Sequence, residues 1–216
     1  MTGPHLVYVA DPMCSWCWGF APVISAIRAR FGAELPIRLV MGGLRPGTTT
    51  PLDDVGKATI GEHWEHVRQA SGQPFDFGFF DREGFVYDTE PCAKAVVVVR
   101  RQGMALALDY LEAIHRSFYA ENRDVTAPEV LADIATPLGL ERRDLIEALD
   151  TEDTRQETWA DFAIAQNAGI RGFPTLLAGR RAGEPYAMIT HGYQPPERIL
   201  TALATWLEAT RTKEAG

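Results

Sequence analysis

The stretch DPMCSWCWGF, residues 11–20, decides the predicted fold of this chain. Its two cysteines, Cys14 and Cys17, are separated by two residues. The β-branched and aromatic run HLVYVA (5–10) before it predicts a strand, and the apolar spacing over 18–31 predicts a helix. We therefore expect the C-x-x-C pair in the turn that connects a strand to the following helix.

That position suits thiol chemistry. The thiolate is the reactive form of a cysteine, and the unpaired N–H groups and partial positive charge of a helix N-terminus favour it. We therefore interpret Cys14 as the entry nucleophile. Cys17 lies one helical turn deeper, from where its sulfur can attack a mixed disulfide held on Cys14.

The pair has two further interpretations, namely half of a zinc site or two merely structural cysteines. Zinc requires two more ligands, and the third cysteine, Cys92, and five scattered histidines form no second paired motif. Burial in the core is the favoured interpretation of Cys92 itself, with a regulatory disulfide as the alternative. We expect neither a metal nor a cofactor.

The rest of the chain predicts an α/β fold with a helical block inside it. Strands are expected at 36–41, 175–178 and 186–190, with a terminal helix at 195–210. No strand pattern interrupts residues 51–150. Helices are expected there and just after at 53–71 (polar and weakly patterned), 90–102, 105–119, 127–138, 142–149 and 152–168.

This order predicts a thioredoxin-like mixed sheet flanked by helices, with an inserted all-helical domain. We place the thioredoxin-like domain at 1–50 and 151–216 and the helical insertion at 51–150. Within the insertion, Thr126 and Glu129 form the pattern of a capping box.

Composition narrows the class of protein. The 216 residues carry a net charge of −8, with 46% apolar and 23% charged residues, which is typical of a globular protein and argues against nucleic-acid binding. The N-terminus shows no secretory signal, and the longest apolar run, 95–99, is too short to span a bilayer. We therefore expect a cytoplasmic protein that does not bind membranes.

A second motif, Phe173-Pro174-Thr175, precedes the first strand of the predicted hairpin. A cis proline at that point would bring the backbone of Phe173 up to Cys14, beside an edge to which an extended peptide can pair. The aromatic side chain of Trp16, expected to be exposed, offers apolar contact to the same substrate.

Together with DPMCSWCWGF and Thr89-Glu90-Pro91-Cys92, the segment Gly172-Phe173-Pro174-Thr175-Leu176 resembles the DsbA-like oxidoreductases, and most of all their cytoplasmic protein-disulfide-isomerase branch. The resemblance spans nearly the whole chain. It implies that Cys14 is the nucleophile, Cys17 the resolving thiol and Pro174 the cis proline of a protein that catalyses dithiol–disulfide exchange. Our candidate substrate contacts are Trp16, Phe173 and Pro174.

The chain departs from the strongly oxidising members, which carry Pro-His where this chain has Ser15-Trp16. Because this dipeptide tunes the reduction potential, we expect a less oxidising protein, a reductase or isomerase. Its expected partners are protein or low-molecular-weight thiols and disulfides, with glutathione among the candidates.

Two other functions stay open. Kappa-class glutathione transferases and hydroxychromene carboxylate isomerases share the fold, but they typically carry serine where Cys14 sits and lack a resolving thiol. A non-catalytic adaptor would use the same groove for partner binding. The aromatic stretch 75–85 could line a substrate groove, although a loop pinned onto the domain interface is the favoured interpretation.

Overall fold

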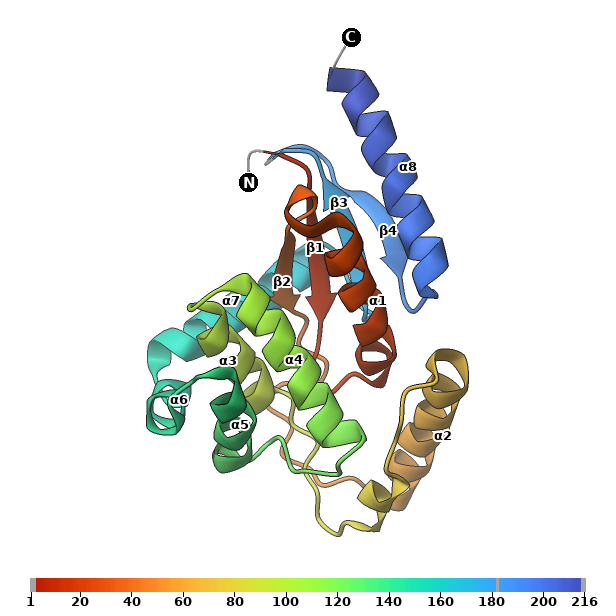
Figure 1. The fold of residues 1–216 in the computed structure, drawn as a ribbon. Helices are drawn as coiled ribbons and strands as arrows, with labels where there is room; N and C mark the ends of the chain where they lie inside the picture. The colour runs from red at the N-terminus through yellow and green to blue at the C-terminus, as the bar shows by residue number, and fades with distance from the viewer. Residues whose placement is uncertain (1–2, 182, 215–216) are drawn as a thin grey trace.

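The computed structural model describes residues 3–181 and 183–214, so residues 1–2, 182 and 215–216, which include both outer ends of the predicted discontinuous domain, lie outside the description. Figure 1 shows how the helices surround a sheet. The elements follow in the order β1 (His5–Ala10), α1 (Ser15–Phe31), η1 (Gly32–Glu34), β2 (Ile37–Met41), α2 (Asp54–Ser71), η2 (Phe77–Asp81), α3 (Glu90–Arg100), α4 (Met104–Tyr119), α5 (Pro128–Ala135), η3 (Thr136–Leu138), α6 (Arg142–Leu149), α7 (Glu152–Asn167), β3 (Thr175–Gly179), β4 (Ala187–His191) and α8 (Pro196–Glu214).

The sheet has the strand order β2-β1-β3-β4. β1 runs parallel to β2, pairing Leu6 with Ile37, and antiparallel to β3, where Val9 lies opposite Thr175. β3 and β4 form an antiparallel hairpin with a register shift between Leu176 and Leu177. This mixed sheet flanked by helices, with a helical insertion between β2 and α7, confirms the predicted fold class.

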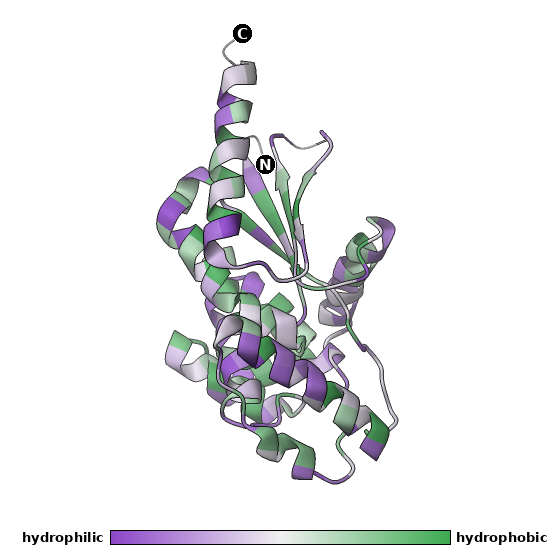
Figure 2. Ribbon diagram, turned by 90° about the vertical axis from the view of Figure 1, so that its right-hand side faces the viewer, coloured by the Kyte–Doolittle hydropathy of each residue, from purple (hydrophilic) through white to green (hydrophobic). Residues whose placement is uncertain are grey.

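The central strand β1 is buried on both faces. Its residues Leu6 and Tyr8 belong to the large core that includes side chains of α1 and α8, whereas Val7 and Val9 belong to a smaller core with Ala165 of α7. Figure 2 shows the strands as predominantly hydrophobic. The turn that carries the C-x-x-C follows the end of β1, so Cys14 and Cys17 are joined directly to an interior, fully buried strand of the sheet.

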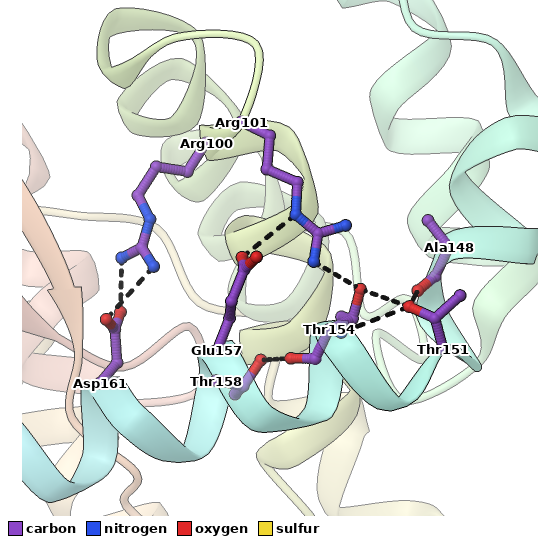
Figure 3. Close-up of polar contacts among 8 residues, drawn as sticks. All are labelled: Arg100, Arg101, Ala148, Thr151, Thr154, Glu157, Thr158 and Asp161. Carbon is purple, nitrogen blue, oxygen red and sulfur yellow. Dashed lines mark hydrogen bonds and ion pairs between the residues drawn. The ribbon is translucent and has the colours of Figure 1, made fainter.

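β2 is an edge strand whose outward backbone groups are bound by helical side chains. Arg100 of α3 donates to the carbonyl of Leu39 at 2.9 Å and pairs with Asp161 of α7, with 2.5 Å between Nη1 and Oδ2 (Figure 3). Asp161 also accepts the N–H of Met41 at 2.9 Å. An open edge is a template for unwanted pairing, so these contacts close the edge and attach the insertion to the sheet.

The insertion consists of two parts. Helices α3–α6 pack against one another, whereas α2 packs against α1 and η2. The contact between α2 and its surroundings centres on Trp64, which is fully buried. The described aromatic rings within 4.8–6.1 Å of it, centroid to centroid, are those of Phe75, Phe77, Phe79, Phe80, Phe118 and Tyr119.

The aromatic stretch 75–85 therefore packs around Trp64, although Phe77 remains 37% exposed. That this cluster lies at a domain interface stays a prediction. The domain boundaries at 50/51 and 150/151 stay a prediction. No helix in the described ranges, 3–181 and 183–214, combines the length and apolar character that crossing a membrane would need.

Candidate active site

The turn after β1 is built from the residues around Cys14. Cys14 is the N-cap of α1, with φ −94° and ψ 114°, and its N–H donates to the carbonyl of Asp11 at 3.1 Å. Its own carbonyl accepts the N–H groups of Cys17 and Trp18 at 2.9 and 3.1 Å, which are the first hydrogen bonds of the helix. The first turn of the helix itself contains no acidic residue.

Both thiols of the pair are free, and they differ in environment. Cys17 is completely buried, and burial, followed by hydrogen bonding and charge interaction with Cys14, raises the pKa of its thiol well above the usual value. Cys14 is 7% exposed and lines a pocket. Of the two sulfurs, only Cys14 therefore offers an approach for another molecule.

The pocket beside Cys14 has a volume of about 240 Å³ and runs between the α1 turn, the loop after β2 and helix α2. Most of its wall is apolar, and it contains no carboxylate. The lining residues are Met13, Cys14, Ser15, Trp16, Leu44, Arg45, Ile60, His63, Trp64, Tyr87 and Phe173.

The segment before β3 lies against the sulfur of Cys14. The Phe173–Pro174 peptide bond is cis, which confirms that expectation, and the carbonyl of Phe173 lies 3.5 Å from Cys14 Sγ. The Phe173 ring packs onto Gly42, where an added Cβ would lie only 2.2 Å from the ring carbons. A side chain at position 42 would therefore displace this ring, so the glycine in the loop after β2 helps to place Phe173.

Trp16 differs from its expected exposure. The indole is half-buried, and its ring lies 5.7 Å from that of Tyr193, centroid to centroid, in the connection before α8. It nevertheless lines the pocket beside Cys14. The C-terminal connection thus covers part of the tryptophan, a contact that no local sequence pattern indicates.

Beneath the turn lies a buried polar group. The carboxylate of Asp11 accepts the N–H of Met13 at 2.9 Å and the N–H of Leu44 at 2.7 Å. Burial is the main cause that raises the pKa of Asp11 to about 6. Asp11 thereby ties the cysteine turn to the loop after β2.

Two side chains of the insertion support the same turn. His115 Nε2 lies 3.2 Å from the carbonyl of Asp11, and burial lowers the pKa of this histidine to about 4, so it is neutral at physiological pH. The Tyr87 hydroxyl donates to the carbonyl of Met13 at 2.8 Å. Sequence reasoning missed both residues because only the tertiary fold brings them to the turn.

Cys92 lies on a different helix from Cys14 and Cys17. It is fully buried at the start of α3, and its thiol donates to the carbonyl of Thr89 at 3.3 Å. Burial raises the pKa of this thiol well above the usual value. Within the described ranges, no group of three or more His, Cys, Asp or Glu side chains has an arrangement that could hold a metal ion.

Comparison with known proteins identifies the family. The model of the DSBA-like thioredoxin domain matches residues 5–204. The chain belongs to this family. A crystal structure from Nitrosomonas europaea, provisionally assigned as a protein disulfide isomerase, is similar with 39% identity, a TM-score of 0.88 and coverage of 96% of this chain and 98% of that one.

Another similar family structure is the cytosolic disulfide reductase DsbM from Pseudomonas aeruginosa, with 27% identity, a TM-score of 0.77 and coverage of 95% and 99% of the two chains. DsbM has also been solved with GSH. These neighbours are disulfide oxidoreductases and isomerases, which supports this general kind of reaction for the fold.

A curated relative has a different role. The chain is 24% identical over 176 residues to the ClpXP adapter protein SpxH of Bacillus subtilis (strain 168). The match covers 80% of this chain but only 58% of that relative. The chain therefore corresponds to little more than half the length of the adapter protein.

Proposed function

We propose that this protein is a thiol–disulfide oxidoreductase that uses Cys14 and Cys17 as its dithiol. The observation that carries the proposal is the unequal placement of the two sulfurs. Cys14 caps α1 and lines a pocket, and Cys17 is buried one turn behind it. An accessible nucleophile with a protected second thiol is the arrangement that two-step disulfide exchange requires.

In the first step, the Cys14 thiolate attacks one sulfur of the substrate disulfide, forms a mixed disulfide and releases the other sulfur as a thiolate. In the second step, Cys17 loses its proton and attacks Cys14 Sγ. The Cys14–Cys17 bond forms and the remaining substrate thiolate leaves. Two electrons pass from the dithiol to the substrate, and the protons end on the released thiols.

Three residues around Cys14 are proposed substrate contacts. Trp16 and Phe173 supply aromatic surface in the pocket wall, and Phe173 and Pro174 form the segment that passes the reactive sulfur. An extended substrate would lie along this backbone, because the carbonyl of Phe173 lies beside the point of attack.

The direction of electron flow is proposed to be reductive or isomerising. The dipeptide Ser15-Trp16 lacks the histidine of strongly oxidising members. The similarity to a reductase named as cytosolic supports a reducing compartment, and its GSH complex supports low-molecular-weight thiols as partners. Glutathione would return the oxidised pair to the dithiol state.

Substitution of single cysteines tests the proposal. We expect Cys14→Ser to slow glutathione-coupled reduction of a disulfide substrate about 100-fold or more, while circular dichroism stays unchanged. Cys17→Ser is expected to accumulate a mixed disulfide, detectable by mass spectrometry. Cys92→Ala is the control and retains activity. Wild-type rates in Cys14→Ser would refute the proposal.

The adapter function is the second candidate, because of the similarity to SpxH. A binding protein of this type would show a partner affinity that depends on the state of the Cys14–Cys17 pair, with no turnover of disulfides. The transferase alternative has less support, because the chain retains both cysteines. Full glutathione-dependent activity in Cys17→Ala would restore it.

A further inference from the structure

The pocket beside Cys14 is lined by a positively charged side chain, that of Arg45, which has no role in the proposed exchange chemistry. Arg45 lies in the loop after β2 and lines the pocket together with His63. No carboxylate contributes to the pocket wall, and within the described residues Arg45 forms no ion pair. Many other arginines of this acidic chain, among them Arg28, Arg68 and Arg100, do pair with carboxylates.

Hydrogen bonds to Thr89, a residue of the insertion, hold the backbone of Arg45 in place. Its N–H donates to the Thr89 hydroxyl at 3.1 Å, and its carbonyl accepts the N–H of Thr89 at 3.3 Å. The preceding residue, Leu44, is held by the carboxylate of Asp11. The loop therefore presents Arg45 at a set position relative to the Cys14 turn, since Asp11 also binds that turn.

The guanidinium is also held. Its central carbon lies 5.3 Å from the centroid of the Tyr87 ring, within the range of a cation–π contact. Tyr87 is buried, and its hydroxyl is anchored to the carbonyl of Met13. The arginine is thus a solvent-accessible, partly ordered cation on an aromatic support, and holding it in place lowers the entropic cost of binding an anion.

We propose that Arg45 determines specificity for small thiols and disulfides that carry a carboxylate, the chemical class to which glutathione belongs. The inference rests on the proposed function and deepens it. A planar guanidinium donates paired hydrogen bonds to a carboxylate, and the net charge of −8 makes a local cation the feature that attracts such an anion.

The size of the pocket favours a small molecule. Its volume of about 240 Å³ lies below the ~300–1,000 Å³ of sites for drug-sized ligands. One arm of a small peptide thiol fits such a space, with its sulfur at Cys14 and its carboxylate at the rim where Arg45 lies. The apolar walls contributed by Leu44 and Ile60 would exclude water from the arm.

Two substrates of different charge test this role. We compare the second-order rate constants at which glutathione disulfide and neutral 2-hydroxyethyl disulfide oxidise the pre-reduced Cys14–Cys17 dithiol of the whole chain. Each measurement is a single turnover, in which the two electrons come from the dithiol itself, so no further reductant is needed. Arg45→Gln is expected to lower the preference for the anionic disulfide about fivefold, the size typical of an exposed charge contact, and to leave the neutral substrate nearly unchanged. Arg45→Lys is expected to retain part of the preference, and salt is expected to weaken it in the wild type.

Arg30→Gln is the matched control. Arg30 is also exposed and also lies over an aromatic ring, that of Phe31 at 5.5 Å, but at the far end of α1. The Arg30→Gln substitution removes one positive charge, as Arg45→Gln does, but at a residue that does not line the pocket. Equal losses on both substrates in Arg45→Gln, an unchanged preference, or the same change in Arg30→Gln would each overturn the inference. A wild type that reduces neither disulfide would instead refute the proposed function.

Discussion

At the scale of single residues, Asp11 connects the Cys14 turn to the loop after β2. Its two carboxylate oxygens bind backbone groups on both sides of the pocket, at Met13 and at Leu44. The side chain is completely buried, and this burial raises the pKa from 3.8 to about 6. The hydrogen bonds from Met13 and Leu44 act in the opposite direction and favour the ionised carboxylate, so they offset part of the effect of burial.

The raised pKa of Asp11 predicts a pH-dependent stability. Between pH ~4 and ~6 the folded state holds a proton that the unfolded state has lost, so this group makes stability fall as pH rises, by about 3 kcal/mol in total. Asp11→Asn cannot ionise. Its destabilisation relative to wild type should therefore shrink by that amount between pH ~4 and ~8 in urea unfolding.

The same substitution at an exposed aspartate, Asp81→Asn, is the control for exchanging a carboxylate for an amide. A difference between Asp11→Asn and wild type that does not change with pH would contradict the burial of the charge.

At the scale of elements, the contacts of Arg100 and Asp161 with the backbone of β2 attach the insertion to the edge of the sheet. Arg100→Ala leaves the largely buried carboxylate of Asp161 without its cation and the carbonyl of Leu39 without its donor. We expect a loss of about 3 kcal/mol in the free energy of unfolding, measured by urea titration.

Arg101 is the control, because it pairs with Glu157 of the same helix α7 at an exposed position and donates to the Thr154 hydroxyl at 3.0 Å, and neither contact involves β2. Arg101→Ala should cost about 1 kcal/mol, since an exposed ion pair and one hydrogen bond each contribute little. Equal costs for the two substitutions would show that the edge contacts with β2 contribute nothing.

The sequence predicts most helices and strands, because apolar spacing and capping residues act within a few neighbouring positions. Helix α2 was predicted as weakly patterned, yet it is continuous: the Asp53 carboxylate caps it through the N–H of Gly56 at 2.7 Å, and Ile60, Trp64 and Val67 bury one face. These three residues have helical spacing, but the surrounding polar residues dilute the pattern.

The predicted capping box at Thr126 was wrong. The N-cap of α5 is Ala127, and the Thr126 hydroxyl donates to the carboxylate of Asp124 at 2.6 Å instead. Aspartate two residues earlier competes for the hydroxyl, and Pro128 starts the helix one residue later than the box requires.

Some residues of the candidate site are predictable from local sequence and others are not. The positions of Cys14 and Cys17 follow from a local strand–turn–helix pattern. Arg45, Tyr87 and His115 come from three separate segments, and only the tertiary fold places them at the turn. No spacing in the sequence could have grouped them.

At the scale of the whole molecule, the pocket depends on how α2 is held. Ile60, His63 and Trp64 of this helix form one wall, and the buried indole of Trp64 is the centre of the aromatic cluster beneath it. Figure 1 shows α2 at the right of the picture, apart from α3, α5 and α6 at the left. The wall therefore relies on this cluster and on the contact with α1.

Trp64→Ala should destabilise the protein by about 3–5 kcal/mol in chemical unfolding, because it removes a fully buried aromatic side chain. It should also weaken the preference for small disulfides by loosening the pocket. Trp159, which is 44% exposed, provides the control, and Trp159→Ala should cost well under half as much. Similar costs would mean that α2 is held by other contacts.

The central claim is that Cys14 and Cys17 form one two-electron redox couple. The most direct test equilibrates the protein in glutathione buffers of increasing oxidising strength, then traps free thiols and maps disulfides by mass spectrometry. We predict a single transition to a Cys14–Cys17 disulfide, with Cys92 remaining a thiol. Two cysteines that stay reduced throughout, or a disulfide that joins Cys14 to any other residue, would contradict it.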